Sequence, residues 1–179
     1  MTVLLSQGCG HKNLEPTRLL GAEGAGQGAL LGPCVEGALT RGEAVVVIDS
    51  QRSWWPAASA ERLRVLRPPA TRAAWVAEQV AASGSVSIVV VRDAGALGRG
   101  GVRLARAAER GGCVVFCLSA RPDPALPATL RLALGGWTPD DAGWTLRFAV
   151  TGRHVREGTV TLRVGAGVEG PAPQAMVAA

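Results

Sequence analysis

The stretch TRLLGAEGAGQG, residues 17 to 28, decides the fold that this sequence predicts. It begins with a short apolar run, continues through a glycine-rich turn, and leads into a segment of helical spacing at 29–41. Gly42 lies just past that segment, where glycine commonly ends a helix. A strand, a tight turn and a helix in this order form the first half of a βαβ unit.

The glycines of this stretch have the spacing of the phosphate-binding pattern G-x-x-x-x-G-K-[ST]. Gly21 and Gly26 occupy the two glycine positions, whereas Gln27 stands at the lysine position and Gly28 at the hydroxyl position. In such a loop the lysine reaches the phosphates and the hydroxyl binds Mg²⁺. We therefore expect the chain to keep the backbone of a nucleotide site without the side chains that hold phosphate and metal.

Strand-like and helix-like segments alternate through the first two thirds of the chain. Unbroken apolar runs of this length fit strands that are buried on both faces of a parallel sheet. The predicted strands are 43–50, 63–66, 85–93 and 112–119, and the predicted helices between them are 70–82 and 97–110.

The pattern changes after a proline-rich link at 122–127. Three further segments alternate apolar and polar residues in the manner of antiparallel strands, and the last two flank a hairpin loop between Gly152 and Gly158. These segments are 129–134, 144–150 and 159–164. The sequence therefore predicts an α/β fold with a mainly parallel sheet, flanking helices and antiparallel C-terminal strands.

The length of 179 residues suits a single domain with a sizeable core. We expect an N-terminal arm at 1–16, a core domain at 17–164 and a flexible tail at 165–179. No run is long and apolar enough to cross a membrane, and the first residues lack the features of a secretory signal, so we expect a cytoplasmic protein. The four cysteines have no metal-site spacing, so we expect reduced thiols and no bound metal.

The order of these elements is similar to the core of RecA, the bacterial recombinase. The segment at 86–97, VSIVVVRDAGAL, resembles the second nucleotide motif of the recombinase. VVVIDSQRSWWP at 45–56 resembles the segment that carries its catalytic glutamate, and ALPATLRLAL at 125–134 resembles the strand after its DNA-binding loop. The similarity covers residues 17–164, and a compact RecA-like chain with an altered phosphate loop most resembles the ImuA family.

The resemblance implies that the nucleotide site is altered at several positions together. Gln51 stands where the catalytic glutamate would be, and an amide cannot act as a base on water. Arg92 stands at the position of the magnesium-binding aspartate, and Asp93 follows one residue later, where a strand turns a side chain to the opposite face. We therefore expect a pseudo-ATPase that is not an enzyme and has no cofactor.

The ImuA resemblance implies a role in the DNA-damage (SOS) response, namely in SOS mutagenesis and translesion DNA synthesis. The implied partners are RecA itself and an inactive, ImuB-like homologue of the Y-family polymerases. Weak binding of the chain to DNA, and its assembly into a homo-oligomer, are also possible on the sequence alone.

Two features are candidate partner-binding sites. Arg99, Arg103, Arg106 and Arg110 are spaced by four, three and four residues, so on a helix they form one basic stripe. The stripe is either a solvated outer face or a docking face for an acidic partner. Trp75 falls among polar neighbours on its helix, so it is either covered by a loop or an exposed aromatic anchor.

Two other functions remain as alternatives. The chain could be a weak or degenerate nucleotide hydrolase that uses Asp49 or Asp93 for the metal. It could also be a DNA-binding module that acts through the arginine stripe, with an affinity that falls as the salt concentration rises.

Overall fold

The structure is a computed structural model, and it describes residues 17–20, 27–53, 61–92, 94–119, 126–141, 143–152 and 156–165. The predicted arm at 1–16 and most of the predicted tail lie outside these ranges. Gly165, which the sequence assigns to the tail, instead ends the last strand.

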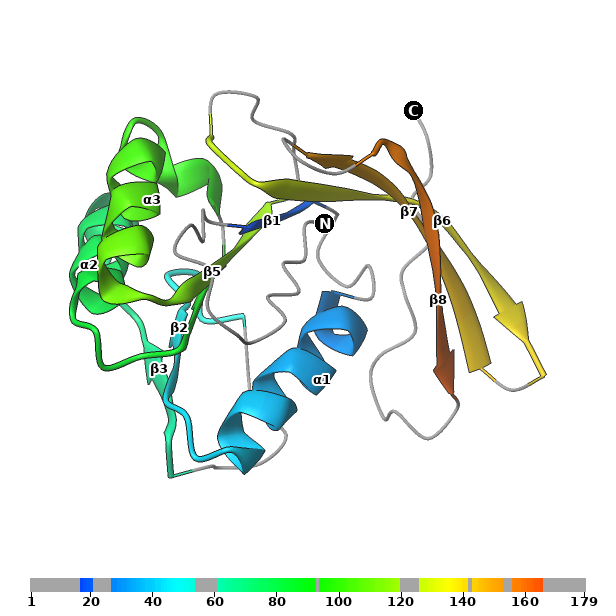
Figure 1. The fold of residues 1–179 in the computed structure, drawn as a ribbon, viewed down its shortest axis with the longest axis horizontal. Helices are drawn as coiled ribbons and strands as arrows, with labels where there is room; N and C mark the ends of the chain where they lie inside the picture. Colours follow the sequence, from blue (N-terminus) through cyan, green and yellow to red (C-terminus); the bar gives the residue numbers. More distant parts are fainter. Residues whose placement is uncertain are drawn as a thin grey trace.

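One mixed sheet organises the described residues (Figure 1). Its strands lie in the order β3-β2-β4-β5-β1-β6-β7-β8. Strands β1 to β6 pair in parallel, and β7 pairs antiparallel with both β6 and β8. The predicted α/β class, with a parallel region and antiparallel C-terminal strands, is confirmed. The strands are β1 Thr17–Leu20, β2 Val45–Ile48, β3 Leu63–Leu66, β4 Ile88–Val91, β5 Val114–Ser119, β6 Leu130–Asp140, β7 Gly143–Gly152 and β8 Gly158–Gly165.

Helices cover the two faces of the parallel region separately. The helices are α1 Gln27–Thr40, α2 Ala70–Ala82, a short 3₁₀ helix η1 Ala94–Leu97, and α3 Gly100–Gly111. Figure 1 shows α2 and α3 side by side, apart from α1. Because successive strand residues point to opposite faces, β2 contributes to both cores. Val46 and Ile48 pack with α2 and α3, whereas Val45 and Val47 pack on the side of α1.

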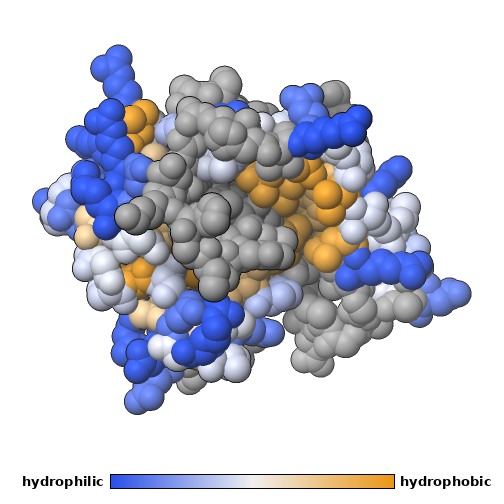
Figure 2. Space-filling view, in the orientation of Figure 1, coloured by the Kyte–Doolittle hydropathy of each residue, from blue (hydrophilic) through white to orange (hydrophobic). Residues whose placement is uncertain are grey.

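The antiparallel strands have one apolar face and one polar face. Leu146, Phe148 and Val150 of β7 are buried, while Arg147 and Ala149 between them are exposed. Figure 2 shows apolar side chains gathered on the side of the molecule where these strands lie. The alternation predicted for 144–150 and the predicted hairpin between β7 and β8 are confirmed.

Several predicted boundaries differ from the observed ones by one to six residues, and glycine geometry accounts for two of these differences. Helix α3 begins at Gly100 instead of residue 97, because Gly98 has a φ of 46° and separates the 3₁₀ helix from α3. Strand β6 continues to Asp140 instead of ending at residue 134. A register shift between Leu134 and Gly136 lets the strand pass two glycines and continue pairing with β7.

Candidate functional site

The carboxyl ends of the parallel strands bring several polar residues to one edge of the sheet. Ile48 of β2 pairs with Val91 of β4, so the next residues, Asp49 and Arg92, lie at one level. The ladder continues there, because the Arg92 amide donates to the Ile48 carbonyl at 3.0 Å. Ligands of open α/β sheets bind outside the carboxyl ends of the strands. This edge is therefore the candidate nucleotide site.

Asp49 is fully buried at this edge and shapes the turn after β2. Its Oδ1 accepts a hydrogen bond from the Ser53 amide at 3.2 Å and one from the Ser53 hydroxyl at 3.4 Å. Arg52, between them, has a φ of 58°, a conformation that side chains rarely adopt. Ser50 Oγ is buried and has no hydrogen-bond partner among the described residues.

The predicted nucleotide-site residues are only partly placed by the structure. Gln27 begins α1, and Gly28 lies exposed in its first turn, where an added Cβ would meet nothing within 4 Å. Gln51 is exposed in the turn after β2, and Arg92 is half-buried. Gly21, Gly26 and Asp93 lie outside the described residues.

The predicted arginine stripe is exposed along one side of α3. Arg103, Arg106 and Arg110 lie on the helix, whereas Arg99 precedes it as the N-cap residue. All four are exposed, while Leu104, Ala107 and Ala108 on the opposite side are buried. The structure thus separates the basic and apolar faces of α3 as the sequence predicts.

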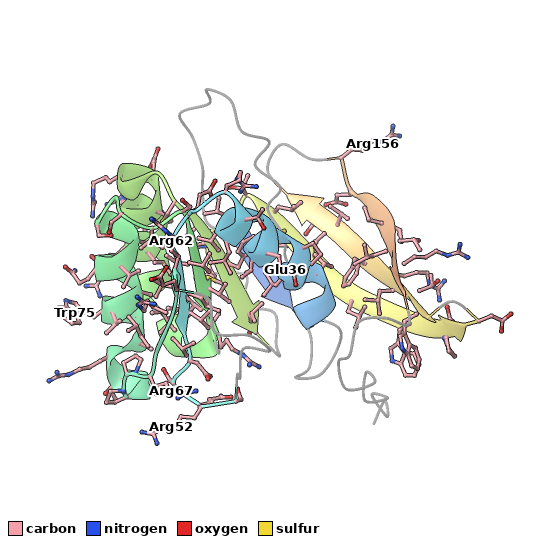
Figure 3. The ribbon with its side chains drawn as sticks, turned by 90° about the horizontal axis from the view of Figure 1, so that it is seen from below. Glu36, Arg52, Arg62, Arg67, Trp75 and Arg156 are labelled. Atoms are coloured by element: carbon pink, nitrogen blue, oxygen red, sulfur yellow. The ribbon has the colours of Figure 1, made fainter. Side chains whose placement is uncertain are left out.

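Trp75 is exposed on α2, which decides between the two alternatives that the sequence left open. Its exposed fraction is 56%, the largest among the exposed large apolar residues of the described chain. Figure 3 shows the indole at the outer edge of the molecule, pointing away from the ribbon. The helix neighbours of Trp75 at three residues before and after are Arg72 and Glu78.

Helices α2 and α3 place Trp75 and the arginine stripe on one continuous surface. The Arg103 guanidinium forms an ion pair with the Glu78 carboxylate, with 3.2 Å between Nε and Oε2. We call this surface the α2–α3 face. It is defined by Arg72, Trp75, Arg99, Arg103, Arg106 and Arg110.

Sequence reasoning missed two features. Arg72 extends the basic surface onto α2, which only the packing of the two helices reveals. Away from that surface, Trp137 and Trp144 meet edge to face on strands β6 and β7, with ring centroids 4.8 Å apart and ring planes at 70°. A signal in the sequence was the short connection between Asp140 and Gly143, which brings residues 137 and 144 close together.

Three of the four cysteines lie in the described part of the chain. Cys34, Cys113 and Cys117 form no disulfide there, and no group of three metal-ligating side chains occurs among the described residues. Burial raises the pKa of the Cys113 thiol from 9.0 to about 11. That thiol stays protonated at neutral pH and is a poor nucleophile there.

No protein-family model matches this chain, and a search of curated proteins finds no relative. No helix in the described part of the chain is long and apolar enough to cross a membrane.

Proposed function

We propose that this chain is a cytoplasmic, non-catalytic RecA-like accessory protein of SOS mutagenesis and translesion synthesis. It binds RecA and limits the growth of the RecA filament and strand exchange. An inactive polymerase homologue of the Y family is its second protein partner. The order of strands and helices on which the RecA resemblance rests is also the order found in the structure, which supports the proposal.

The single observation that supports the absence of catalysis in this proposal is the arginine that follows β4. Arg92 lies level with the buried Asp49, at the edge where a nucleotide and its metal would bind. A guanidinium about 4 Å from a divalent ion opposes it by roughly 4 kcal/mol per unit-charge pair, and by about twice that for Mg²⁺. Gln51 in the neighbouring turn cannot replace a catalytic glutamate. Both features favour a scaffold that contacts proteins over an ATPase.

The shared core gives the mechanism. A protein shaped like a recombinase subunit docks on the end or side of a RecA filament, and it lacks the surfaces that the next subunit needs. The filament then stops growing or comes apart, and strand exchange slows. No step of this mechanism requires the chain to bind or hydrolyse ATP.

Two measurements on the purified chain test the proposal. Co-sedimentation with RecA filaments on single-stranded DNA, combined with a strand-exchange assay, should show binding and slower exchange. Titration calorimetry with ATP and Mg²⁺ should show no magnesium-dependent heat. Absence of co-sedimentation together with unchanged strand exchange would overturn the RecA role, and magnesium-dependent heat would overturn the non-catalytic role.

A second candidate, a weak nucleotide hydrolase, is favoured by one observation. The hydroxyl of Ser50 is buried beside Asp49 without a partner among the described residues, and a buried polar atom of this kind is costly unless something binds it. In this case Asp49 would be expected to hold the metal. The same calorimetry decides, since this candidate predicts heat that disappears in Asp49→Asn.

A further inference from the structure

Helices α2 and α3 lie in close contact along their length, so their outward side chains form a single surface. Near the start of α3, a Cβ added to Gly100 would lie 3.0 Å from the Ala74 Cβ of α2. Near its end, a Cβ added to Gly111 would overlap the Ala81 carbonyl oxygen. The two glycines let the helices approach closely, so the outward side chains of α2 and α3 lie side by side.

The α2–α3 face carries an excess of positive charge. Its exposed arginines outnumber the glutamates of these helices by five to two, counting Glu78 and Glu109. Of these five arginines, Arg103 alone forms an ion pair with a described residue, namely Glu78. The other four have no ion pair with any residue that the structure describes. The bond to Glu78 also shows that this surface accepts a carboxylate.

Two of these arginines stand where they weaken their own helices. Arg99 is the N-cap residue of α3, and no side chain caps that helix. Arg72 lies in the first turn of α2, which likewise has no side-chain cap and no acidic residue. The amino end of a helix carries partial positive charge and disfavours cations. Residues that oppose the preference of their own helix in this way are expected at functional surfaces.

Trp75 supplies an apolar anchor beside these charges. It is 56% exposed, and Val102 on α3 is 46% exposed. Tryptophan and arginine are the residue types that most often dominate the binding energy of protein interfaces. The α2–α3 face therefore combines an aromatic anchor with cations that can bind carboxylates.

The shape and composition of the face favour a protein over a nucleic acid. Proteins that hold single strands combine a basic groove with aromatic platforms for successive bases. The α2–α3 face is the outer side of two packed helices, Trp75 is its only aromatic side chain among the described residues, and Glu78 and Glu109 would repel phosphates.

We propose that the α2–α3 face binds an acidic protein segment that carries at least one aromatic or large aliphatic side chain. The carboxylates of the segment pair with Arg99, Arg106 and Arg110, and its apolar side chain packs on Trp75. Only the identity of the partner rests on the proposed function, in which the segment belongs to the protein that the chain docks on.

The test uses the full chain and two probes, a fluorescent peptide of glutamates and leucines with helical spacing and a fluorescent thymidine oligonucleotide. We expect the peptide to bind more tightly than the oligonucleotide. The triple variant R99S/R106S/R110S should lower the affinity for the peptide by about tenfold or more, and Trp75→Ala by up to about 30-fold. The control R52S/R62S/R156S removes the same charge from exposed positions outside α2 and α3 and should change it less than about twofold.

Three results would overturn the inference: tighter binding of the oligonucleotide, no binding of the peptide, or an equal loss in the two triple variants. Co-sedimentation with RecA filaments separates this inference from the proposed function. If wild type and R99S/R106S/R110S both co-sediment, the α2–α3 face is not the docking surface and the RecA role stands. If the peptide binds but wild type does not co-sediment, the RecA role fails and the inference stands.

Discussion

Arg103 on α3 and Glu78 on α2 form an ion pair with 3.2 Å between Nε and Oε2. The pair crosses the seam between the two helices, three residues after Trp75 on the side of α2. The Arg103 side chain is 65% exposed and that of Glu78 is 19% exposed. The ion pair therefore fixes the orientation of the Glu78 carboxylate at the seam, and we expect it to add little to the free energy of unfolding.

Replacement of Arg103 should accordingly have a small effect on stability. We expect Arg103→Ala to lower the free energy of unfolding by less than about 1 kcal/mol, because the Arg103 guanidinium is largely exposed and solvent weakens its attraction to Glu78. Urea unfolding measures the change. The double variant Arg103→Ala/Glu78→Gln is the control. A much larger loss of unfolding free energy in the single variant than in the double variant would mean that the Glu78 carboxylate is destabilising without its partner.

Arg99→Ser should stabilise the protein while it weakens binding to the acidic peptide. Serine at the N-cap can accept a hydrogen bond from the first turn of α3, and the change removes a cation from the positive end of the helix. We expect a gain of about 1 kcal/mol, which raises Tm by roughly 2–4 °C in a chain of this size. Thermal unfolding checks the gain. Unchanged or lower stability would contradict the inference that Arg99 destabilises the amino end of α3.

A matched pair of glycine substitutions tests the contact between α2 and α3. A Cβ at Gly111 would overlap the Ala81 carbonyl oxygen, so Gly111→Ala should lower the free energy of unfolding by about 1–3 kcal/mol. A Cβ at Gly32 in α1 meets nothing within 4 Å, so Gly32→Ala should raise it by about 0.5–1 kcal/mol. Chemical denaturation of both variants measures the difference in sign. Equal changes in unfolding free energy for the two variants would show that α2 and α3 are packed less closely at Gly111 than the structure indicates.

Stability should fall at alkaline pH because of Cys113. Burial raises the pKa of this thiol from 9.0 to about 11. Between these values the unfolded chain has lost the proton and the folded chain keeps it, so the stabilisation is complete below pH 9 and is lost as pH rises toward 11. Two pKa units correspond to roughly 2–3 kcal/mol.

Apart from the three other cysteines, few groups titrate in that window, because the chain has no tyrosine and Lys12 is its only lysine. Guanidinium unfolding of wild type and Cys113→Ala from pH 8 to pH 10.5 measures the effect. The slope of stability against pH should be shallower in the variant. Identical slopes would assign the effect to another group.

Restoring the phosphate-loop side chains should not by itself restore magnesium-dependent ATP binding. The space around Gly28 is open, so Gln27→Lys/Gly28→Ser should fold normally and gain weak affinity for ATP. Arg92 still opposes the metal, and Mg²⁺ should strengthen binding only when Arg92→Asp is added. Calorimetry of ATP with and without Mg²⁺ separates these outcomes. Full magnesium dependence in the first variant would show that Arg92 lies away from the metal position.

Much of the fold follows from sequence patterns that are local. Helix α2 occupies residues 70–82 as predicted, because Ala73 and Ala77 recur on one face and Pro68 and Pro69 precede the helix. Strand β3 likewise occupies residues 63–66 as predicted. The exposed stripe on α3 was also predictable, since helical periodicity alone sorts side chains between the inner and outer faces. The exposure of Trp75 was not, because periodicity does not show whether a loop covers a residue.

Tertiary structure decided which of these local features meet. Residues 74 and 100, or 78 and 103, are far apart in the chain, and no periodicity shows that α2 and α3 touch at these points. The extra length of β6 depended on a bulge and on pairing with β7. The sequence by itself determined element types and their faces, because both arise from backbone periodicity. The α2–α3 face, and the position of Arg92 beside Asp49 at the sheet edge, were decided by the tertiary structure alone. Both depend on contacts between segments that are distant in the chain.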